Sequence, residues 1–261
     1  MDLGIRGRTA LVGGASSGIG LASARALAAE GVRVALVARR HEETARAAAA
    51  IAEEFNVEAL AIPVDLAQPG AAESAHERAE AHFRSVDIMV PNAGGPPKGH
   101  FDALSDDDWR RAFELTYLST VRMMRAGLPG MRQRRWGRIV VIGSLVTVEP
   151  RPELTLSSGL RTGLVGLTKL VAREAAADGV TVNLLSPGYT RTQRQVELTG
   201  GDPTQPAAST QALDAIAREI PVGRMAEASE IGAVVAFLAS RQAAFLTGIN
   251  LLVDGGHTRG V

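Results

Sequence analysis

A glycine-rich turn near the N-terminus is the part of the chain whose residue types point most directly to chemistry. Residues 13–20 read GGASSGIG, after an apolar run at residues 9–12 and before a helical pattern at residues 19–30. Glycine permits close approach of the backbone, and the free amides and dipole at a helix N-terminus attract phosphate. This motif predicts a dinucleotide site, against the alternative of a tight turn without a ligand. The predicted site consists of Gly14, Ser16, Ser17, Gly18, Ile19 and Gly20.

The residues after the next apolar run indicate which dinucleotide binds. Residues 32–37 are followed by Ala38, Arg39 and Arg40. A site for NAD usually has an acid here that binds the ribose 2′-hydroxyl, whereas an arginine accommodates a 2′-phosphate. Arg39, with Ser16 as a second donor, therefore predicts a preference for NADP(H) over NAD(H). The alternative is that both arginines are solvated charges at the start of a helix.

Polar residues also end two further apolar runs. Asp65 follows one of them, and Asn92, Ala93 and Gly94 follow another. The carboxyl ends of parallel strands meet at one rim, where this kind of fold binds its ligand. These residues are expected beside the dinucleotide, although each could instead serve the local turn.

The elements that position these residues form a regular alternation. Seven short apolar runs, continuous rather than alternating with polar residues, are separated by longer helical patterns, which is typical of a parallel sheet covered on both faces. We predict an α/β fold, a single-domain doubly wound parallel sheet of Rossmann type with about seven strands over residues 1–261. Strands are expected at residues 9–12, 32–37, 57–64, 86–90, 138–142, 180–185 and 249–253, and helices at residues 19–30, 42–55, 71–83, 106–132, 157–177 and 229–240.

Residues 193–221 break this alternation. The segment is polar, contains glycine and proline, and follows the sixth predicted strand. Because ligands bind beyond the carboxyl ends of the strands, we predict a mobile lid or substrate loop here; a long surface excursion is the alternative.

Composition restricts the function classes. The formal net charge is zero and no long run of like charges occurs, which argues against nucleic acid and anionic membranes as partners. The absence of cysteine excludes a thiol nucleophile, a disulfide and a cysteine-built metal site. His76 and His82 are six residues apart and cannot share one helix face, so no metal site is indicated. The N-terminus lacks an apolar signal segment, and a cytoplasmic protein is expected.

Taken together, these motifs resemble the short-chain dehydrogenase/reductase family over essentially the whole chain, and in particular its reductases of β-ketoacyl thioesters. Besides the glycine turn, the matching segments are PNAG at residues 91–94, GRIVVIGS at 137–144, VNLLSPGYT at 182–190 with Thr192, and LLVDGG at 251–256. The resemblance implies NADP(H), a small carbonyl or alcohol substrate, and a homodimer or homotetramer. It also implies that Pro187, Gly188 and Thr192 meet the nicotinamide, while Asp65 and residues 92–94 line the adenosine side. The Gly163 and Gly166 spacing offers a face for contact between subunits.

The same resemblance exposes departures at the catalytic positions. In the family, an active-site Ser is followed by a Tyr and, four residues later, by a Lys; here these positions hold Ser144, Ser157 and Arg161. The Asn that the family places on the preceding long helix is Thr116. No Tyr-x-x-x-Lys occurs anywhere in the chain.

These departures matter because carbonyl reduction needs a proton donor as well as a hydride. A phenol with a reference pKa of about 10, lowered by a neighbouring ammonium, serves in the family pattern, and a Ser hydroxyl is a far poorer acid. Arg161 could contact the nicotinamide ribose, polarise an oxyanion, or be a helix-surface cation, and Tyr189 is another candidate donor. Two hypotheses remain: an oxidoreductase with a non-standard proton route, or a catalytically degenerate member that serves as a nucleotide-binding regulatory or structural subunit.

Overall fold

Seven parallel strands form one sheet in the computed structural model, which describes residues 2–199 and 206–260, with the backbone alone for 206–212. They are β1 (Thr9–Gly13), β2 (Arg33–Ala38), β3 (Ala59–Pro63), β4 (Ile88–Val90), β5 (Gly137–Ile142), β6 (Val180–Pro187) and β9 (Asn250–Val253). Their order is β3-β2-β1-β4-β5-β6-β9, with the switch in winding direction between β1 and β4. The predicted doubly wound parallel sheet is confirmed, with strand ends that differ from the predicted ones by one or two residues.

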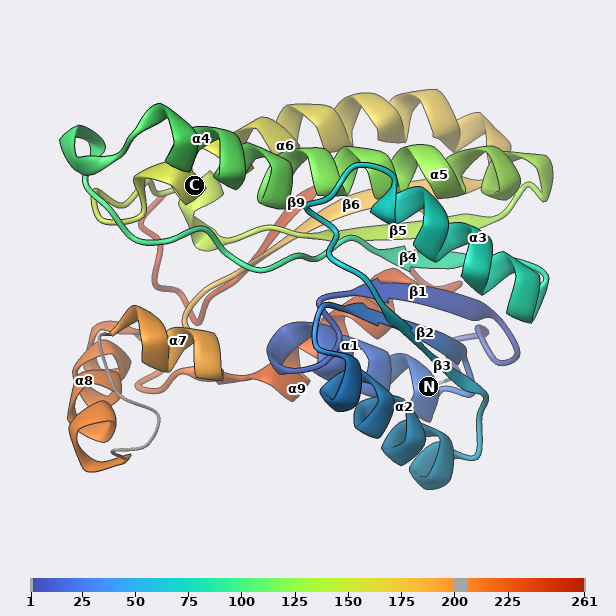
Figure 1. The fold of residues 1–261 in the computed structure, drawn as a ribbon, viewed down its shortest axis with the longest axis horizontal. Coiled ribbons are helices and arrows are strands. Elements are labelled where there is room, and N and C mark those ends of the chain that lie inside the picture. Colours follow the sequence, from blue (N-terminus) through green and yellow to red (C-terminus); the bar gives the residue numbers. More distant parts are fainter. Residues whose placement is uncertain (1, 200–205, 261) are drawn as a thin grey trace.

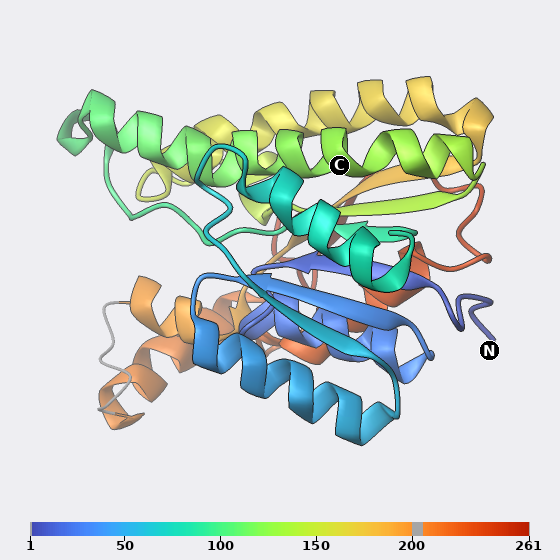
Figure 2. The same cartoon turned by 45° about the vertical axis from the view of Figure 1, so that its right-hand side comes forward.

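Nine helices accompany the sheet in the described part of the chain. They are α1 (Gly18–Ala29), α2 (His41–Phe55), α3 (Ala71–Phe83), α4 (Asp106–Phe113), α5 (Ser119–Gln133), α6 (Thr155–Ala175), α7 (Gln193–Leu198), α8 (Pro206–Glu219) and α9 (Ala228–Leu238). Figures 1 and 2 show α1, α2 and α9 on one face of the sheet and α3, α4, α5 and α6 on the other. Each face has its own buried apolar cluster. Every residue of β1, β5 and β6 is buried, as expected for strands of a parallel sheet that helices cover on both faces.

The long helix predicted at residues 106–132 is interrupted. A π-helical turn at Glu114–Leu118 joins α4 to α5. On its two sides the packing partners differ, because α4 contacts α6 whereas α5 contacts α3. A π-helical turn holds one more residue per turn than an α-helix, so it rotates the two halves relative to each other. No Gly or Pro marks these five positions, and the sequence pattern therefore did not reveal the break.

Residues 193–221 contain α7 and α8, and residues 200–205 lie outside the described part. The base of this excursion is pinned by two short strands, β7 (Thr190–Arg191) and β8 (Ala226–Glu227), which pair in parallel. A small apolar cluster of Leu213, Ile220 and Met225 packs between α8 and Tyr189. The excursion is largely helical, and its movement as a lid stays a prediction.

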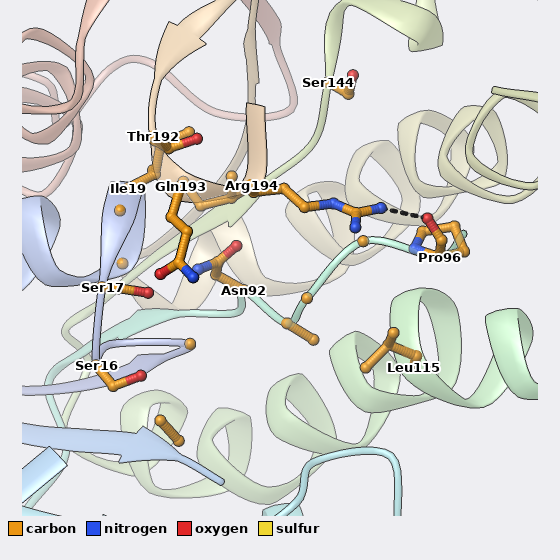
Figure 3. Close-up of a pocket in the computed structure, with 18 of the residues that line it drawn as sticks. Ser16, Ser17, Ile19, Asn92, Pro96, Leu115, Ser144, Thr192, Gln193 and Arg194 are labelled. Atoms are coloured by element: carbon orange, nitrogen blue, oxygen red, sulfur yellow. Dashed lines mark hydrogen bonds between the residues drawn. The ribbon is translucent and has the colours of Figure 1, made fainter. Parts of the chain in front are cut away.

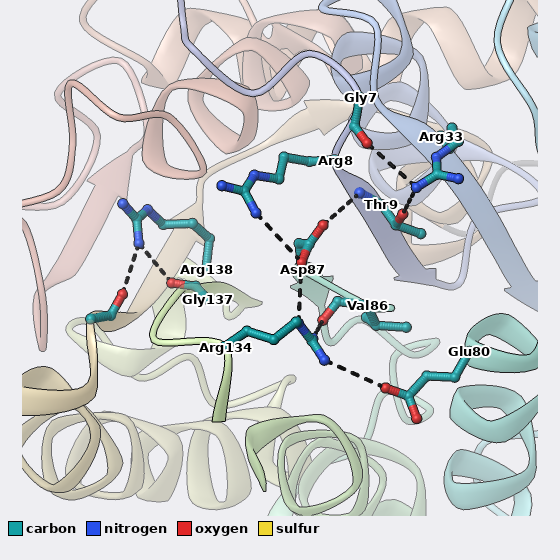
Figure 4. A network of polar contacts seen from close by, with 11 residues as sticks. Gly7, Arg8, Thr9, Arg33, Glu80, Val86, Asp87, Arg134, Gly137 and Arg138 are labelled. Carbon is teal, nitrogen blue, oxygen red and sulfur yellow. Dashed lines mark hydrogen bonds and ion pairs between the residues drawn. The ribbon is translucent and has the colours of Figure 1, made fainter. Parts of the chain in front are cut away.

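The amino end of the sheet carries a compact charge network (Figure 4). The buried Asp87 carboxylate accepts a hydrogen bond from the Thr9 amide at 3.2 Å. Its other oxygen lies 3.8 Å from Arg8 Nη1 and 3.5 Å from Arg134 Nε. Arg134 also donates to the Val86 carbonyl at 2.7 Å. The carboxylate is thus paired on both oxygens.

Candidate active site

A cavity of about 480 Å³ lies at the carboxyl ends of the central strands. All the site residues expected from the sequence line it, except Thr116 and the candidate proton donor Tyr189. They are Gly14, Ser16, Ser17, Gly18, Ile19, Gly20, Arg39, Asp65, Asn92, Ala93, Gly94, Ser144, Ser157, Arg161, Pro187, Gly188 and Thr192. Residues from seven separate segments therefore meet in one place.

The glycine turn has the geometry that a bound pyrophosphate requires. Gly18 has a φ of +56°, and a Cβ at Gly20 would lie 2.3 Å from the Gly14 carbonyl oxygen, so neither position accepts another residue without strain. Ser17 is the N-cap of α1, is extended, and makes no side-chain capping bond. The first-turn amides of α1 consequently remain free to bind an anion.

The two arginines after β2 differ in their contacts. Arg40 Nη2 lies 3.3 Å from Ser16 Oγ and 3.1 Å from Ser17 Oγ, so it holds the hydroxyls of the turn. Arg39 is exposed at the cavity rim and has no ion-pair partner within residues 2–199 and 206–260. Both arginines line the cavity, and Arg40 also contacts the hydroxyls of the turn, which the sequence did not indicate.

The rim beside the glycine turn is held by polar side chains. Asn92 Nδ2 donates to the Gly13 carbonyl at 3.1 Å and so ties the end of β4 to the end of β1. Asp65 accepts a hydrogen bond from the Ala67 amide at 3.1 Å. A Cβ at Gly94 would meet no atom within 4 Å, which leaves open space over this rim.

Arg161 is the cationic group predicted for the reacting end of the cavity, and it is buried, with 9% of its surface exposed. Its Nη1 donates to the carbonyls of Ile142 and Gly143, at 3.0 and 3.4 Å. Nε and Nη2 make no hydrogen bond with the described residues, and Arg161 lines the cavity. Burial, together with the nearby Arg194 charge, lowers the pKa of Arg161 to about 10. The alternative of a helix-surface cation is excluded.

The two serines reach the same end of the cavity from different elements. Ser144 follows β5, and its Oγ accepts a hydrogen bond from the Val146 amide at 3.5 Å. Ser157 lies in the first turn of α6 and is partly buried. Both serines line the cavity with Arg161, and their hydroxyls can donate hydrogen bonds to a ligand.

The structure does not bring Thr116 to the cavity. Its hydroxyl donates to the Ala112 carbonyl at 2.6 Å, one helical turn back, and the side chain is 2% exposed. Leu115 lines the cavity instead. The physical reason is the π-helical turn, which sets which side chain of this segment faces the strand ends.

Neither tyrosine lines the cavity. Tyr117 stacks on Phe113 with ring centroids 5.3 Å apart, and Tyr189 meets the His257 ring edge-on at 5.1 Å. Burial is the largest cause of a raised pKa for Tyr189. A phenol that has a raised pKa and does not line the cavity is a poor proton donor to it, which argues against Tyr189 as the proton donor.

Arg194, on α7, is a site residue that the sequence reasoning missed. Its Nη2 donates to the Pro96 carbonyl at 2.5 Å, across the cavity between α7 and the loop after β4 (Figure 3). Nη1 lies 3.5 Å from Glu197 Oε2. The polarity of residues 193–221 was visible in the sequence, but the direction of one side chain was not.

Two negative findings concern the residues that the structure describes. No group of three His, Asp or Glu side chains among them is arranged to hold a metal ion. None of their helices combines the length and the hydropathy needed to cross a bilayer.

Comparison with known proteins gives matches over nearly the whole chain. The family model described as enoyl-(acyl carrier protein) reductase matches residues 14–258. The chain is 35% identical over 254 residues to the 3-oxoacyl-(acyl-carrier-protein) reductase of Escherichia coli, covering 97% of this chain and 98% of that protein.

Solved structures give the same result. L-sorbose reductase from Gluconobacter frateurii, complexed with NADPH and L-sorbose, superposes with a TM-score of 0.94 at 32% identity over all of both chains. The 3-oxoacyl-(acyl-carrier-protein) reductase from Agrobacterium tumefaciens with NADP bound gives 0.89 at 34% identity, covering 98% of this chain and 96% of that one. Each similarity extends over nearly the full length of both proteins.

Proposed function

The chain belongs to the short-chain dehydrogenase/reductase family of NAD(P)H-dependent oxidoreductases, and we propose that it uses NADP(H) to interconvert a small carbonyl compound and its alcohol by a proton route that involves no tyrosine. One observation carries this proposal. A single cavity joins the phosphate-binding turn at Gly14–Gly20 to Ser144, Ser157 and Arg161. A bound dinucleotide would therefore extend from the turn to the polar groups of the reacting end.

The residues of the cavity fit an NADP(H) molecule. The free amides of α1 and the open space over Gly94 suit the pyrophosphate, and Arg39 suits the 2′-phosphate. Pro187, Gly188 and Thr192 would surround the nicotinamide, and Asp65 with Asn92 and Ala93 the adenosine.

When bound, the cofactor supplies the hydride that adds to the carbonyl carbon. The protein has to orient the carbonyl and to stabilise the negative charge that develops on its oxygen. The Ser144 and Ser157 hydroxyls donate to that oxygen, and the Arg161 charge stabilises the alkoxide. The proton then comes from water at the open side of the cavity, through the Ser157 hydroxyl. This route lacks a tuned acid, which costs about 10² to 10⁴ in rate.

Titration of NADPH and NADH fluorescence tests the cofactor preference. We expect NADPH to bind about tenfold more tightly, the effect of one charge-assisted contact, and Arg39→Asp to reverse the order. Arg78→Asp, on the exposed face of α3 and away from the cavity, is the matched control. Equal affinities for the two cofactors in the unmodified protein would refute the preference.

A turnover assay on ketones and β-ketoacyl thioesters tests the activity itself. The second candidate function, a nucleotide-binding subunit without catalysis, is favoured by Ser157 and Arg161 in place of the family's Tyr and Lys. NADPH binding without oxidation on any member of the panel would support this second candidate. Measurable oxidation that Arg161→Gln abolishes would support the reductase.

We also propose that the protein forms a homodimer or homotetramer through the outer face of α6. Gly166 meets no atom within 4 Å, and Leu170 is 62% exposed one turn further on. Gly163 is not part of this face, because a Cβ there would lie 3.0 Å from Tyr117 of the same chain. Light scattering should give a multiple of the chain mass, and Leu170→Arg should reduce it. A monomer at micromolar concentration would contradict the proposal.

A further inference from the structure

The Arg161 guanidinium is a buried charge without an opposing one. No carboxylate of the described residues lies within 4.0 Å of it, and its protein contacts are the two carbonyls at the end of β5. Burying an ion is costly unless it is paired, so such a group is usually completed by a counter-ion. Both bonds to the carbonyls use Nη1, and Nε and Nη2 make none with the described residues. Nε and Nη2 form the side of a guanidinium that a carboxylate bridges with two parallel hydrogen bonds.

A second cation faces the same space. Arg194 extends over the cavity from α7 (Figure 3), and its charge contributes to the lowered pKa of Arg161, as expected for two cations that repel each other. Glu197 also lines the cavity but lies 3.5 Å from Arg194 Nη1, so it offsets that charge rather than the charge of Arg161. The reacting end of the cavity thus keeps an excess of positive charge.

The pyrophosphate of the cofactor is not in place to neutralise Arg161. The phosphate-binding turn follows β1, whereas the Arg161 contacts lie at the end of β5, and β4 separates the two strands. Two strand spacings amount to about 10 Å, beyond the reach of an ion pair. Asp65 lies further away still, after β3 at the sheet edge.

We infer that the substrate carries a carboxylate close to its carbonyl group, and that Arg161, assisted by Arg194, binds this carboxylate. The inference rests on the proposed function and names the substrate class, an oxo acid rather than a neutral ketone. Ser144 and Ser157 line the same cavity as Arg161, so their hydroxyls are the donors available to the neighbouring carbonyl oxygen. The carboxylate of the bound substrate would then neutralise the Arg161 charge, which no carboxylate of the described residues pairs with.

Calorimetric titration with acetoacetate and with methyl acetoacetate tests the inference, each with and without saturating NADP⁺. The two probes differ in charge and share the carbonyl. We expect the acid to bind at least about tenfold more tightly than the ester, as one charge-assisted hydrogen bond would give. The same ratio should appear in KM when NADPH oxidation is followed.

Three variants locate the effect. Arg161→Gln should bring the affinity for the acid down to that for the ester, and Arg194→Gln should lower the acid-to-ester ratio less. Arg78→Gln, outside the cavity, should leave the ratio unchanged. Circular dichroism checks the fold of each variant, and Arg194→Gln, which alters a partly exposed side chain, still reports on the charge if Arg161→Gln does not fold.

Two results would overturn the inference. Equal affinities for acid and ester, or no binding of the acid, would show that the cavity does not select an anion. An unchanged ratio in Arg161→Gln, with NADPH binding lost, would assign Arg161 to the cofactor. Failure of the unmodified protein to bind NADPH would instead refute the proposed function, and the ratio measured without cofactor would still test the anion site.

Discussion

The two ends of the parallel sheet differ in whether a buried charged side chain is paired with an opposite charge. At the amino end, Asp87 is paired with Arg8 and Arg134 and accepts the Thr9 amide. At the carboxyl end, Arg161 has two carbonyls and no carboxylate. Both groups are nearly inaccessible, with 5% and 9% of their surfaces exposed.

A second buried arginine shows that the contrast is not simply one of charge sign. Arg138, near the amino end, bonds the carbonyls of Gly137, Gly179 and Ser240 at 2.8 to 3.2 Å and lies over the Trp136 ring. The hydrogen-bond donors of Arg138 are largely satisfied within the protein. The amino end is therefore organised for folding, and the carboxyl end leaves donors open for a ligand.

The largest expected effect is a gain of activity at the carboxyl end. Ser157→Tyr with Arg161→Lys restores the phenol and its tuning ammonium, and kcat/KM for a ketone that lacks a carboxylate should rise by about 10²-fold or more. Each single change should do little. The Tm should change little as well, because side chains at this end of the sheet make few interactions with the rest of the protein.

Adding Thr116→Asn to that pair should help only if the new side chain reaches the cavity, which the hydroxyl of Thr116 does not. Family-like rates in the unmodified protein would show that another group already donates the proton. A double variant that binds NADPH and ketone yet stays inert would show that the pocket has diverged further.

Asp87→Ala should destabilise the protein by about 2 kcal/mol, because the buried Thr9 amide loses its acceptor. For a chain of this size we expect Tm to fall by about 4 to 8 °C. NADPH affinity should not change, since Asp87 lies at the opposite end of the strands. Asp106→Ala, an exposed carboxylate at the start of α4, is the control. An unchanged Tm would remove the contrast between the two ends.

A matched pair of substitutions compares the buried arginines directly. Arg138→Met should cost about 1 kcal/mol, since it leaves carbonyls unpaired in a closed environment. Arg161→Met should cost less, because the loss of its two bonds to carbonyls is offset by the removal of an unpaired buried charge. Urea unfolding measures both. A larger loss for Arg161→Met than for Arg138→Met would reverse the assignment of the two ends.

The smallest effect concerns His76, which is linked to the amino-end network through Glu80. Burial, the largest influence, and the Arg134 charge lower the pKa of His76 below 6.5, against the opposing effects of Glu80 and Glu77. The native state then binds fewer protons than the unfolded state, so stability is complete above about pH 6.5 and declines as the pH falls below it. His76→Gln should flatten this decline in urea midpoints, and His82→Gln, at an exposed position, should not.

Much of the site could be predicted because it depends on local patterns. The glycines between β1 and α1 and the arginine after β2 act through backbone conformation and charge, which the sequence displays directly. The cap of α4 is another case, since Ser105 and Asp108 form the reciprocal capping bonds that their spacing favours.

The rest of the site depends on the direction in which tertiary packing points each side chain. Arg161 was placed at the site by resemblance, but its burial follows from how α6 packs on β6, which no local pattern shows. Arg194 lies in a polar segment whose composition does not determine where a side chain points. Leu115 rather than Thr116 lines the cavity because of the π-helical turn, and no residue pattern in the sequence marks that turn.

The π-helical turn at Glu114–Leu118 has a consequence for how this segment can vary over evolution. An α-helix advances about 100° per residue, so losing one residue here would rotate everything before it against everything after it. Trp109, against which a Cβ at Gly159 would lie 3.1 Å away, would leave its place on α6 if α5 kept its contact with α3. We therefore expect the segment to tolerate substitutions more readily than changes in length. Among related sequences, single-residue deletions between residues 114 and 118 should be rarer than substitutions there.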